Sequence, residues 1–306
     1  MATIAKNAPG PAVKEEGEAP WRRLVGDFCR SPLAVGGLIV FVAIVLVAIF
    51  APLISPQNPY DLNQLDIMDS RQRPGSASGD GYTFWLGSDG QGRDMLSAIF
   101  YGLRISLAVG VSSAILAAAL GTTIGLMAAY FGGKVDTLLM RAVDIKLSFP
   151  AILIALIIVA VLGSGTWKIV LALVIVQWAL YARTVRGSAL VERRKEYVEA
   201  ARCLALSHSR IVFRHMLPNC LPPLIVVGTV QIANSIALEA TLSFLGIGLP
   251  ITEPSLGLLI SNGFEYMMSG QYWISVFPGV ALLVTIVSIN LVGDQLRDIL
   301  NPRLQK

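Results

Sequence analysis

Runs of apolar residues long enough to cross a bilayer recur along this 306-residue chain, and they constrain its fold more than any other feature. A transmembrane helix needs about 20 predominantly apolar residues. Segments that approach or exceed this length occupy residues 33–54, 105–131, 145–162, 167–181, 221–245 and 274–292. Only 14% of the residues are charged, whereas soluble proteins carry about a quarter. The sequence therefore predicts an all-α membrane protein with six transmembrane helices.

Lysine and arginine indicate how these helices are oriented. They gather before the first predicted helix, between the fourth and fifth, and after the sixth, whereas residues 247–273 contain none. Cytoplasmic loops are enriched in both residues, so both termini are predicted to be cytoplasmic. The predicted divisions are a cytoplasmic N-terminal tail (1–32), a first transmembrane helix (33–54), an extracytoplasmic loop (55–100), a five-helix core (101–300) with a cytoplasmic loop (183–220), and a cytoplasmic C-terminal tail (301–306).

Small residues recur every four positions in the second predicted helix. One row includes Gly110, and a second includes Gly121 and Gly125. Membrane helices associate by close backbone approach, which such rows permit, so we expect this helix to pack centrally. Glycine and alanine are also simply common in membrane helices, and the rows are compatible with that explanation too.

The fifth predicted helix is the most polar. Gln231, Ser235 and Glu239 recur every four residues and share one face, with Asn234 beside them. An ionisable residue within a membrane usually faces protein or water. These four residues are candidates for lining a translocation path. Alternatively they form a hydrogen-bonded lock between helices, or Glu239 lies near enough to the outer interface to be wet.

Motifs for catalysis and metal binding are missing from the sequence. No phosphate-binding G-x-x-x-x-G-K-[ST] loop occurs, and the glycine-rich residues 87–94 are interpreted as a turn. His208 and His215 lack zinc-site spacing, and three scattered cysteines suggest no disulfide framework. The net charge of +4 is explained by cytoplasmic loops rather than nucleic-acid binding. We expect no catalytic residue, no metal site and no cofactor in this chain.

A basic, half-apolar segment separates the fourth and fifth predicted helices. The run EYVEAARCLALSHSRIVFRHMLPN, residues 196–219, predicts two short helices joined by a bend. Ser207 can cap the second helix, and Pro218 is expected to end it before the fifth span. This form suits a knob that fits a cleft in a partner protein. An amphipathic helix lying on lipid headgroups is the alternative.

The same segment resembles a signature of ABC importer permeases, E-A-A-x-x-x-G followed after nine residues by I-x-L-P. Glu199-Ala200-Ala201 match its start and Met216-Leu217-Pro218-Asn219 its end, but Ala205 replaces the glycine. A left-handed alanine costs on the order of 1 kcal/mol. We therefore expect either a milder bend or a right-handed Ala205.

Further stretches extend the resemblance over most of the chain. LGSDGQGRDMLSAIFYGLRISL, MRAVDIKLSFP, EATLSFLGIG and NLVGDQLRDILNPRL are similar to stretches of the peptide/nickel-type subfamily. The chain most resembles the membrane subunit with a long external loop after its first span.

The resemblance implies a type I ABC importer permease fold in the bacterial inner membrane. The implied complex has a second homologous permease subunit, two ATP-binding subunits that bind ATP and Mg²⁺, and an extracytoplasmic substrate-binding protein. The implied substrates are di- or oligopeptides, with nickel, glutathione and opines handled by similar subunits. A secondary transporter or exporter that needs no ATPase partner is the alternative. The residues implied in ATPase coupling are Glu199, Ala200, Ala201, Ala205, Leu206, Ser207 and Pro218.

Overall fold

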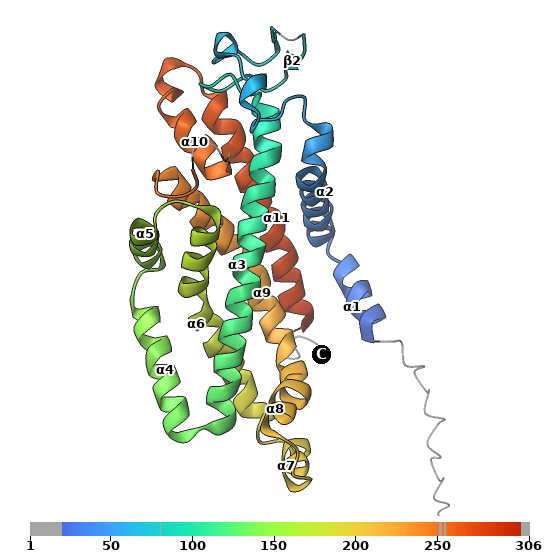
Figure 1. Cartoon of the computed structure of the whole chain (residues 1–306). Coiled ribbons are helices and arrows are strands. Elements are labelled where there is room, and N and C mark those ends of the chain that lie inside the picture. Colours follow the sequence, from blue (N-terminus) through green and yellow to red (C-terminus); the bar gives the residue numbers. More distant parts are fainter. Residues whose placement is uncertain (1–19, 80, 251–252, 254, 301–306) are drawn as a thin grey trace, which may run out of the picture.

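Helix α3 (Met95–Phe131) runs almost the full length of the molecule, and the other long helices lie around it (Figure 1). The computed structural model describes residues 20–79, 81–250, 253 and 255–300. The other long helices are α2 (Pro32–Ile54), α6 (Thr166–Glu192), α9 (Leu217–Phe244) and α11 (Trp273–Leu300). Within these described residues, five helical stretches are long and apolar enough to cross a membrane, and a bent pair makes a sixth. This arrangement confirms the predicted six-helix fold.

Shorter elements connect the long helices and cover their ends. The short helices are α1 (Pro20–Cys29), α4 (Gly133–Ser148), α5 (Ala151–Leu162), α7 (Glu196–Cys203), α8 (His208–Arg210) and α10 (Leu256–Phe264). Strands β1 (Ser76–Ala77) and β2 (Thr83–Phe84) pair antiparallel, and single 3₁₀ turns occupy Leu62–Gln64, Ile67–Asp69 and Met267–Ser269. The strands and α10 lie at one end of the bundle, and α7 and α8 lie at the other (Figure 1).

The centre of the bundle depends on backbone contact between α3 and its neighbours. A Cβ atom on Gly121 would lie 2.3 Å from the carbonyl oxygen of Trp178 in α6. One on Gly125 would lie 2.5 Å from that of Ala182, and one on Gly110 would lie 2.5 Å from Ile236 in α9. Only glycine permits these approaches. The small residues of α3 therefore face two neighbouring helices, α6 and α9.

The start of the second predicted helix and the end of the fourth need correction. Helix α3 begins at Met95 rather than residue 105, because Asp94 caps it by accepting a 2.8 Å hydrogen bond from the backbone N–H of Ser97. The predicted external loop is correspondingly shorter. Helix α6 continues past residue 181 to Glu192, and its polar last turns project toward α7.

The third predicted span is not one continuous helix. Helices α4 and α5 meet at an angle of 91°. Pro150 explains the break, since it disfavours helical geometry at Phe149, whose backbone is extended. Helix α5 has 12 residues and is thus about 18 Å long, too short to cross a bilayer alone. The continuous span predicted for residues 145–162 is therefore wrong.

Pro218 does not end a helix, which also corrects the sequence prediction. The chain is helical from His208 to Phe244, with a π-helical stretch over Ile211–Met216 immediately before Leu217. A proline inside an α-helix removes a hydrogen bond and clashes with the preceding turn. The wider π turn changes the hydrogen-bond register directly before Pro218, so the helix continues through the proline.

The predicted N-terminal tail contains a helix that sequence analysis did not anticipate. Helix α1 precedes α2, and the side-chain amide of Gln295 in α11 donates a 3.2 Å hydrogen bond to the carbonyl oxygen of Asp27. The helices at the two ends of the described chain, α1 and α11, thus meet at the same end of the molecule as α7 and α8 (Figure 1).

We expect Gly121→Val to disrupt the contact between α3 and α6. The side chain would overlap a backbone carbonyl that cannot move independently, and overpacking costs about 1–3 kcal/mol or more. The measurement is the thermal unfolding midpoint of the purified chain. Gly187→Val in α6 is the matched control, because a Cβ atom there meets nothing within 4 Å. Equal midpoints for both variants would contradict the packing role of Gly121.

Candidate functional site

Helix α7 and the turn that follows it project from one end of the bundle as a knob, residues 196–207 (Figure 1). Its underside is apolar: Val198 and Ala201 are buried in a cluster with Leu126 of α3 and Val185 of α6. Its outer face is exposed and includes Glu199 and the residues Glu196, Ala200, Cys203, Leu204 and Ala205. The small exposed side chains leave the helix backbone open to close approach by another protein.

The turn of the knob is a Schellman motif. The N–H of Leu206 donates to the carbonyl oxygen of Ala201 at 3.2 Å, and that of Ala205 donates to Arg202 at 2.9 Å. This pairing places the residue after the helix cap in the left-handed region. Ala205 indeed has φ +53°, so the expectation of a right-handed alanine or a milder bend is wrong.

Tertiary packing explains why the alanine adopts this conformation. Leu206 packs on the same apolar cluster as Ala201, which is the hydrophobic contact that accompanies a Schellman motif. The end of α9 forms the same pattern, but with Gly246 at φ +76°. Ser207 starts α8 without a side-chain capping bond, so its predicted capping role is absent.

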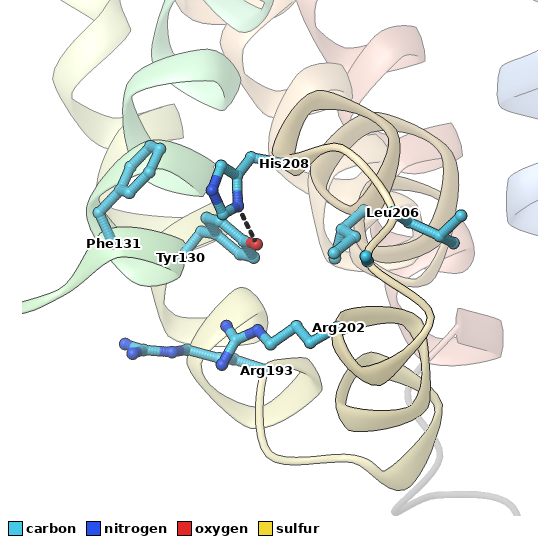
Figure 2. A pocket seen from close by; sticks show the side chains of 8 residues that line it. Tyr130, Phe131, Arg193, Arg202, Leu206 and His208 are labelled. Carbon is cyan, nitrogen blue, oxygen red and sulfur yellow. Dashed lines mark hydrogen bonds between the residues drawn. The ribbon is translucent and has the colours of Figure 1, made fainter.

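Behind the knob lies an open cavity of about 570 Å³ between α3, α6, α7 and α8. Figure 2 shows the ring of His208 beside that of Tyr130. The two rings meet edge to face, and the Tyr130 hydroxyl lies 2.7 Å from Nδ1 of His208. Arg202 extends from α7 toward the ring of Tyr130. Its guanidinium carbon lies 5.0 Å from the centroid of that ring, which is a cation–π distance. Tyr130 thus contacts both short helices of the loop.

Arg193 fixes the end of α3 on the other side of this cavity. Its guanidinium donates a 2.9 Å hydrogen bond to the carbonyl oxygen of Ala129, which satisfies a helix C-terminus. A Cβ atom on Gly132 would lie 2.7 Å from that guanidinium. Gly132 therefore lets Arg193 approach the helix end.

A polar network joins the start of the knob to the start of α9. The hydroxyl of Tyr197 donates to Glu192 at 2.7 Å, and the side-chain amide of Asn219 donates to that hydroxyl at 3.2 Å. Burial and the neighbouring Glu192 raise the pKa of Tyr197 to about 12. Lys195 pairs with Glu192 at 2.7 Å. Asn219, the last residue of the matched motif, thus tethers α9 to the knob.

Sequence analysis missed most of these contacts. His208 was considered only as a zinc ligand, and Tyr130, Arg193 and Arg202 were not singled out. The aromatic pair Tyr130-Phe131 directly before two glycines was the available signal, because it marks a helix end with side chains suited to packing. Pro218 is exposed and makes none of the contacts described here.

The structure separates the four polar residues of α9. Glu239 is fully buried and accepts hydrogen bonds from Ser106 of α3 at 2.9 Å and from Ser243 at 2.8 Å, with Ser255 as a further partner. Ser235 is also buried and exchanges hydrogen bonds with Gln177 of α6. These contacts join α9 to α3, α6 and the start of α10.

Gln231 and Asn234 are placed differently. They are joined by a 2.9 Å hydrogen bond and line a second cavity beside α4 and α5. The four residues therefore do not form one polar surface: Ser235 and Glu239 lock helices together, whereas the buried Gln231 and the exposed Asn234 line the second cavity.

The glycine-rich residues 87–94 form a turn at the opposite end of the molecule. Asp89 and Arg93 make a buried ion pair at 2.8 Å, and the backbone N–H of Asp94 donates to Gln57 at 2.6 Å. The indole of Trp273 in α11 donates to the carbonyl oxygen of Ser88. This segment anchors the loop between α2 and α3, and burial raises the pKa of Asp94 above its usual range.

We expect Ala205→Gly to stabilise the knob by about 1 kcal/mol, since glycine adopts the left-handed conformation without the alanine's steric cost. Ala200→Gly is the matched control in the same short helix, where glycine should destabilise by about 0.5–1 kcal/mol. Native-state hydrogen exchange over residues 196–210 gives the local unfolding free energy. A decrease of similar size in both variants would contradict the strained conformation at Ala205.

Comparison with known proteins agrees with this architecture. The family model described as "Binding-protein-dependent transport system inner membrane component" matches residues 121–306. A second model, "N-terminal TM domain of oligopeptide transport permease C", matches residues 19–74. A chain of the MetNI methionine ABC transporter in inward-facing form has a similar fold, with a TM-score of 0.54 and 19% identity over 68% of this chain and 98% of that one.

Three relatives are similar over nearly their whole lengths. The dipeptide transport system permease DppC of Alkalihalophilus pseudofirmus is 35% identical over 100% of this chain and 97% of that protein. The glutathione transport system permease GsiD of Pectobacterium atrosepticum is 35% identical over 96% and 95%. The di/tripeptide permease DppC of Pseudomonas aeruginosa is 34% identical over 98% and 97%. The chain therefore belongs to the family of binding-protein-dependent transport system inner membrane components, and it is a multi-pass inner membrane permease with the ABC importer fold.

Proposed function

We propose that this chain is the permease subunit of an ATP-driven importer of peptides and forms half of its translocation path. Relatives named for dipeptide, di/tripeptide and glutathione transport support a small peptide substrate. A second homologous permease subunit supplies the other half of the path. Two ATP-binding subunits dock at the knob, and an extracytoplasmic binding protein delivers the peptide at the opposite end. ATP and Mg²⁺ bind to the ATP-binding subunits, and this chain contributes no catalytic residue and no cofactor.

The structure of the knob is the observation that carries this proposal. Its underside is fixed to the bundle by Val198 and Ala201, whereas its outer face, with Glu199 and Ala200, is exposed. A docked subunit would therefore contact a surface fixed to the bundle that carries small side chains and the two carboxylates of Glu196 and Glu199. Such a surface transmits a displacement instead of absorbing it.

The arrangement of the ends supports a cytoplasmic position for the knob. Helices α1 and α11 meet at the knob's end, and the basic residues of the loop lie there as well. Arg194, Arg202, Arg210 and Arg214 are all exposed. Under the positive-inside rule, the knob and both termini lie in the cytoplasm.

Glu199→Arg tests the coupling role. Reversing a charge at a docked surface removes its partner's hydrogen bond and costs about 2–5 kcal/mol, so we expect at least about a tenfold loss. The quantities measured are peptide uptake by proteoliposomes that contain the complete importer, and binding-protein-stimulated ATP hydrolysis. Both should fall while the permease still inserts and assembles with its membrane partner.

Lys134→Glu is the control for charge reversal at the same end of the molecule. Lys134 is exposed on α4 and lies outside the knob, so transport should stay within about twofold of the unmodified importer. Unchanged uptake by Glu199→Arg would contradict the coupling role. Isolation of an active transporter without ATP-binding subunits would instead favour a secondary transporter.

A further inference from the structure

The second cavity lies beside the bend between α4 and α5 and has a volume of about 390 Å³. Small-molecule sites in proteins have volumes of roughly 300–1,000 Å³. Its walls come from α4, α5, α6 and the outer half of α9. Most lining residues are apolar, and the polar ones are Lys146, Gln177, Gln231, Asn234 and Thr241.

Lys146 is the charged residue of this cavity. It lies in the last turn of α4 and is half-buried. The acidic residues of α4 are already paired, Asp136 with Arg186 and Asp144 with Arg183. Across the described part of the chain, no ion pair or hydrogen bond joins the Lys146 ammonium group. The cavity therefore contains a positive charge without a counter-ion.

Gln231 and Asn234 provide hydrogen-bonding groups in the same cavity. The side-chain amide of Asn234 donates to the side-chain oxygen of Gln231 at 2.9 Å. This bond uses an N–H of Asn234 and the side-chain oxygen of Gln231. The side-chain N–H groups of Gln231 and the side-chain oxygen of Asn234 therefore remain for a ligand. A peptide bond presents the complementary acceptor and donor.

The exposure of these groups indicates what lies over the cavity. Asn234 is exposed on α9, a helix long and apolar enough to cross a membrane, and the half-exposed Lys146 lines the same cavity. Polar groups at membrane depth face protein or a water-filled space rather than lipid. The cavity thus opens toward an aqueous path.

We propose that this cavity is a transit site for the carboxylate end of a peptide. The Lys146 ammonium group pairs with the terminal carboxylate, and the amides of Gln231 and Asn234 bind the adjacent peptide bond. The apolar walls, including Leu180 and Leu238, contact the side chain. The inference rests on the proposed peptide importer and assigns to Lys146 a role in substrate passage.

Thiol protection measures occupancy of this site directly. Exposed Cys29 and Cys203 are replaced by serine, and Ala237→Cys places a reactive thiol on the cavity wall. The complete importer in detergent is alkylated in the presence of L-alanyl-L-alanine or its C-terminal amide. We expect dialanine to slow alkylation and the uncharged amide to have little effect.

Lys146→Gln in this background should raise the dialanine concentration needed for protection by about tenfold, the effect of losing one charged hydrogen bond. Lys146→Arg should retain protection, and Lys134→Gln, an exposed cation outside the cavity, should leave it unchanged. Equal protection by acid and amide, protection that survives Lys146→Gln, or no protection at all would overturn the assignment.

Peptide uptake by the unmodified importer distinguishes the two proposals. Uptake of labelled dialanine without protection of the thiol refutes only the transit site. Failure to take up any peptide refutes the proposed function as well.

Discussion

Close approach of α3 to α6 and α9 at glycine positions is the constraint on which the rest of this structure depends. Lipid gives no hydrophobic drive for helices to associate, so close packing and hydrogen bonds must hold them together. Gly110, Gly121 and Gly125 allow α3 to touch two neighbours at once. Buried polar groups then fix the register: Ser106 bonds to Glu239, and Gln177 bonds to Ser235.

The same three helices determine where the knob is held. Each of α3 and α6 continues past the apolar part of the bundle, and their ends supply the surface on which α7 packs. Tyr130, at the end of α3, contacts His208 of α8. Arg193, at the end of α6, donates a hydrogen bond to Ala129 of α3. The knob is thus joined to the ends of α3 and α6 by apolar packing and by side-chain contacts.

The sequence predicted the parts of the fold that follow from hydrophobic length and residue size. The five continuous long helices, the central position of the glycine-rich helix and the exposed loop between α6 and α9 belong to this group. The 91° bend was missed because the apolar run continues across Phe149-Pro150, although the proline was visible. Pro218 was misjudged because a π-helical stretch depends on tertiary packing and has no clear sequence pattern.

The candidate site shows a similar division. The motif identified Glu199 and Ala200 as an exposed surface, but the conformation of Ala205 could not be derived from its identity. Intrinsic preference argues against a left-handed alanine. The partial burial of Leu206 beside Ala201 offsets that preference, because removing apolar side-chain area from water is favourable and the strain is only on the order of 1 kcal/mol. Contacts such as Tyr130 with His208 join residues 78 apart and have no local signal.

One continuous helix links the knob to the second cavity. From His208 to Phe244 the chain has no break in its helical structure, and Asn234 lies about 35–40 Å along it at 1.5 Å per residue. The π-helical stretch and Pro218 lie at its knob end, where Asn219 ties it to Tyr197. One helical stretch therefore leads from the knob to Gln231 and Asn234, and it contains Pro222 and Pro223 between them. The buried Glu239 is on the same helix and joins it to α3 and the start of α10, so hydrogen bonds fix this helix at both of its ends.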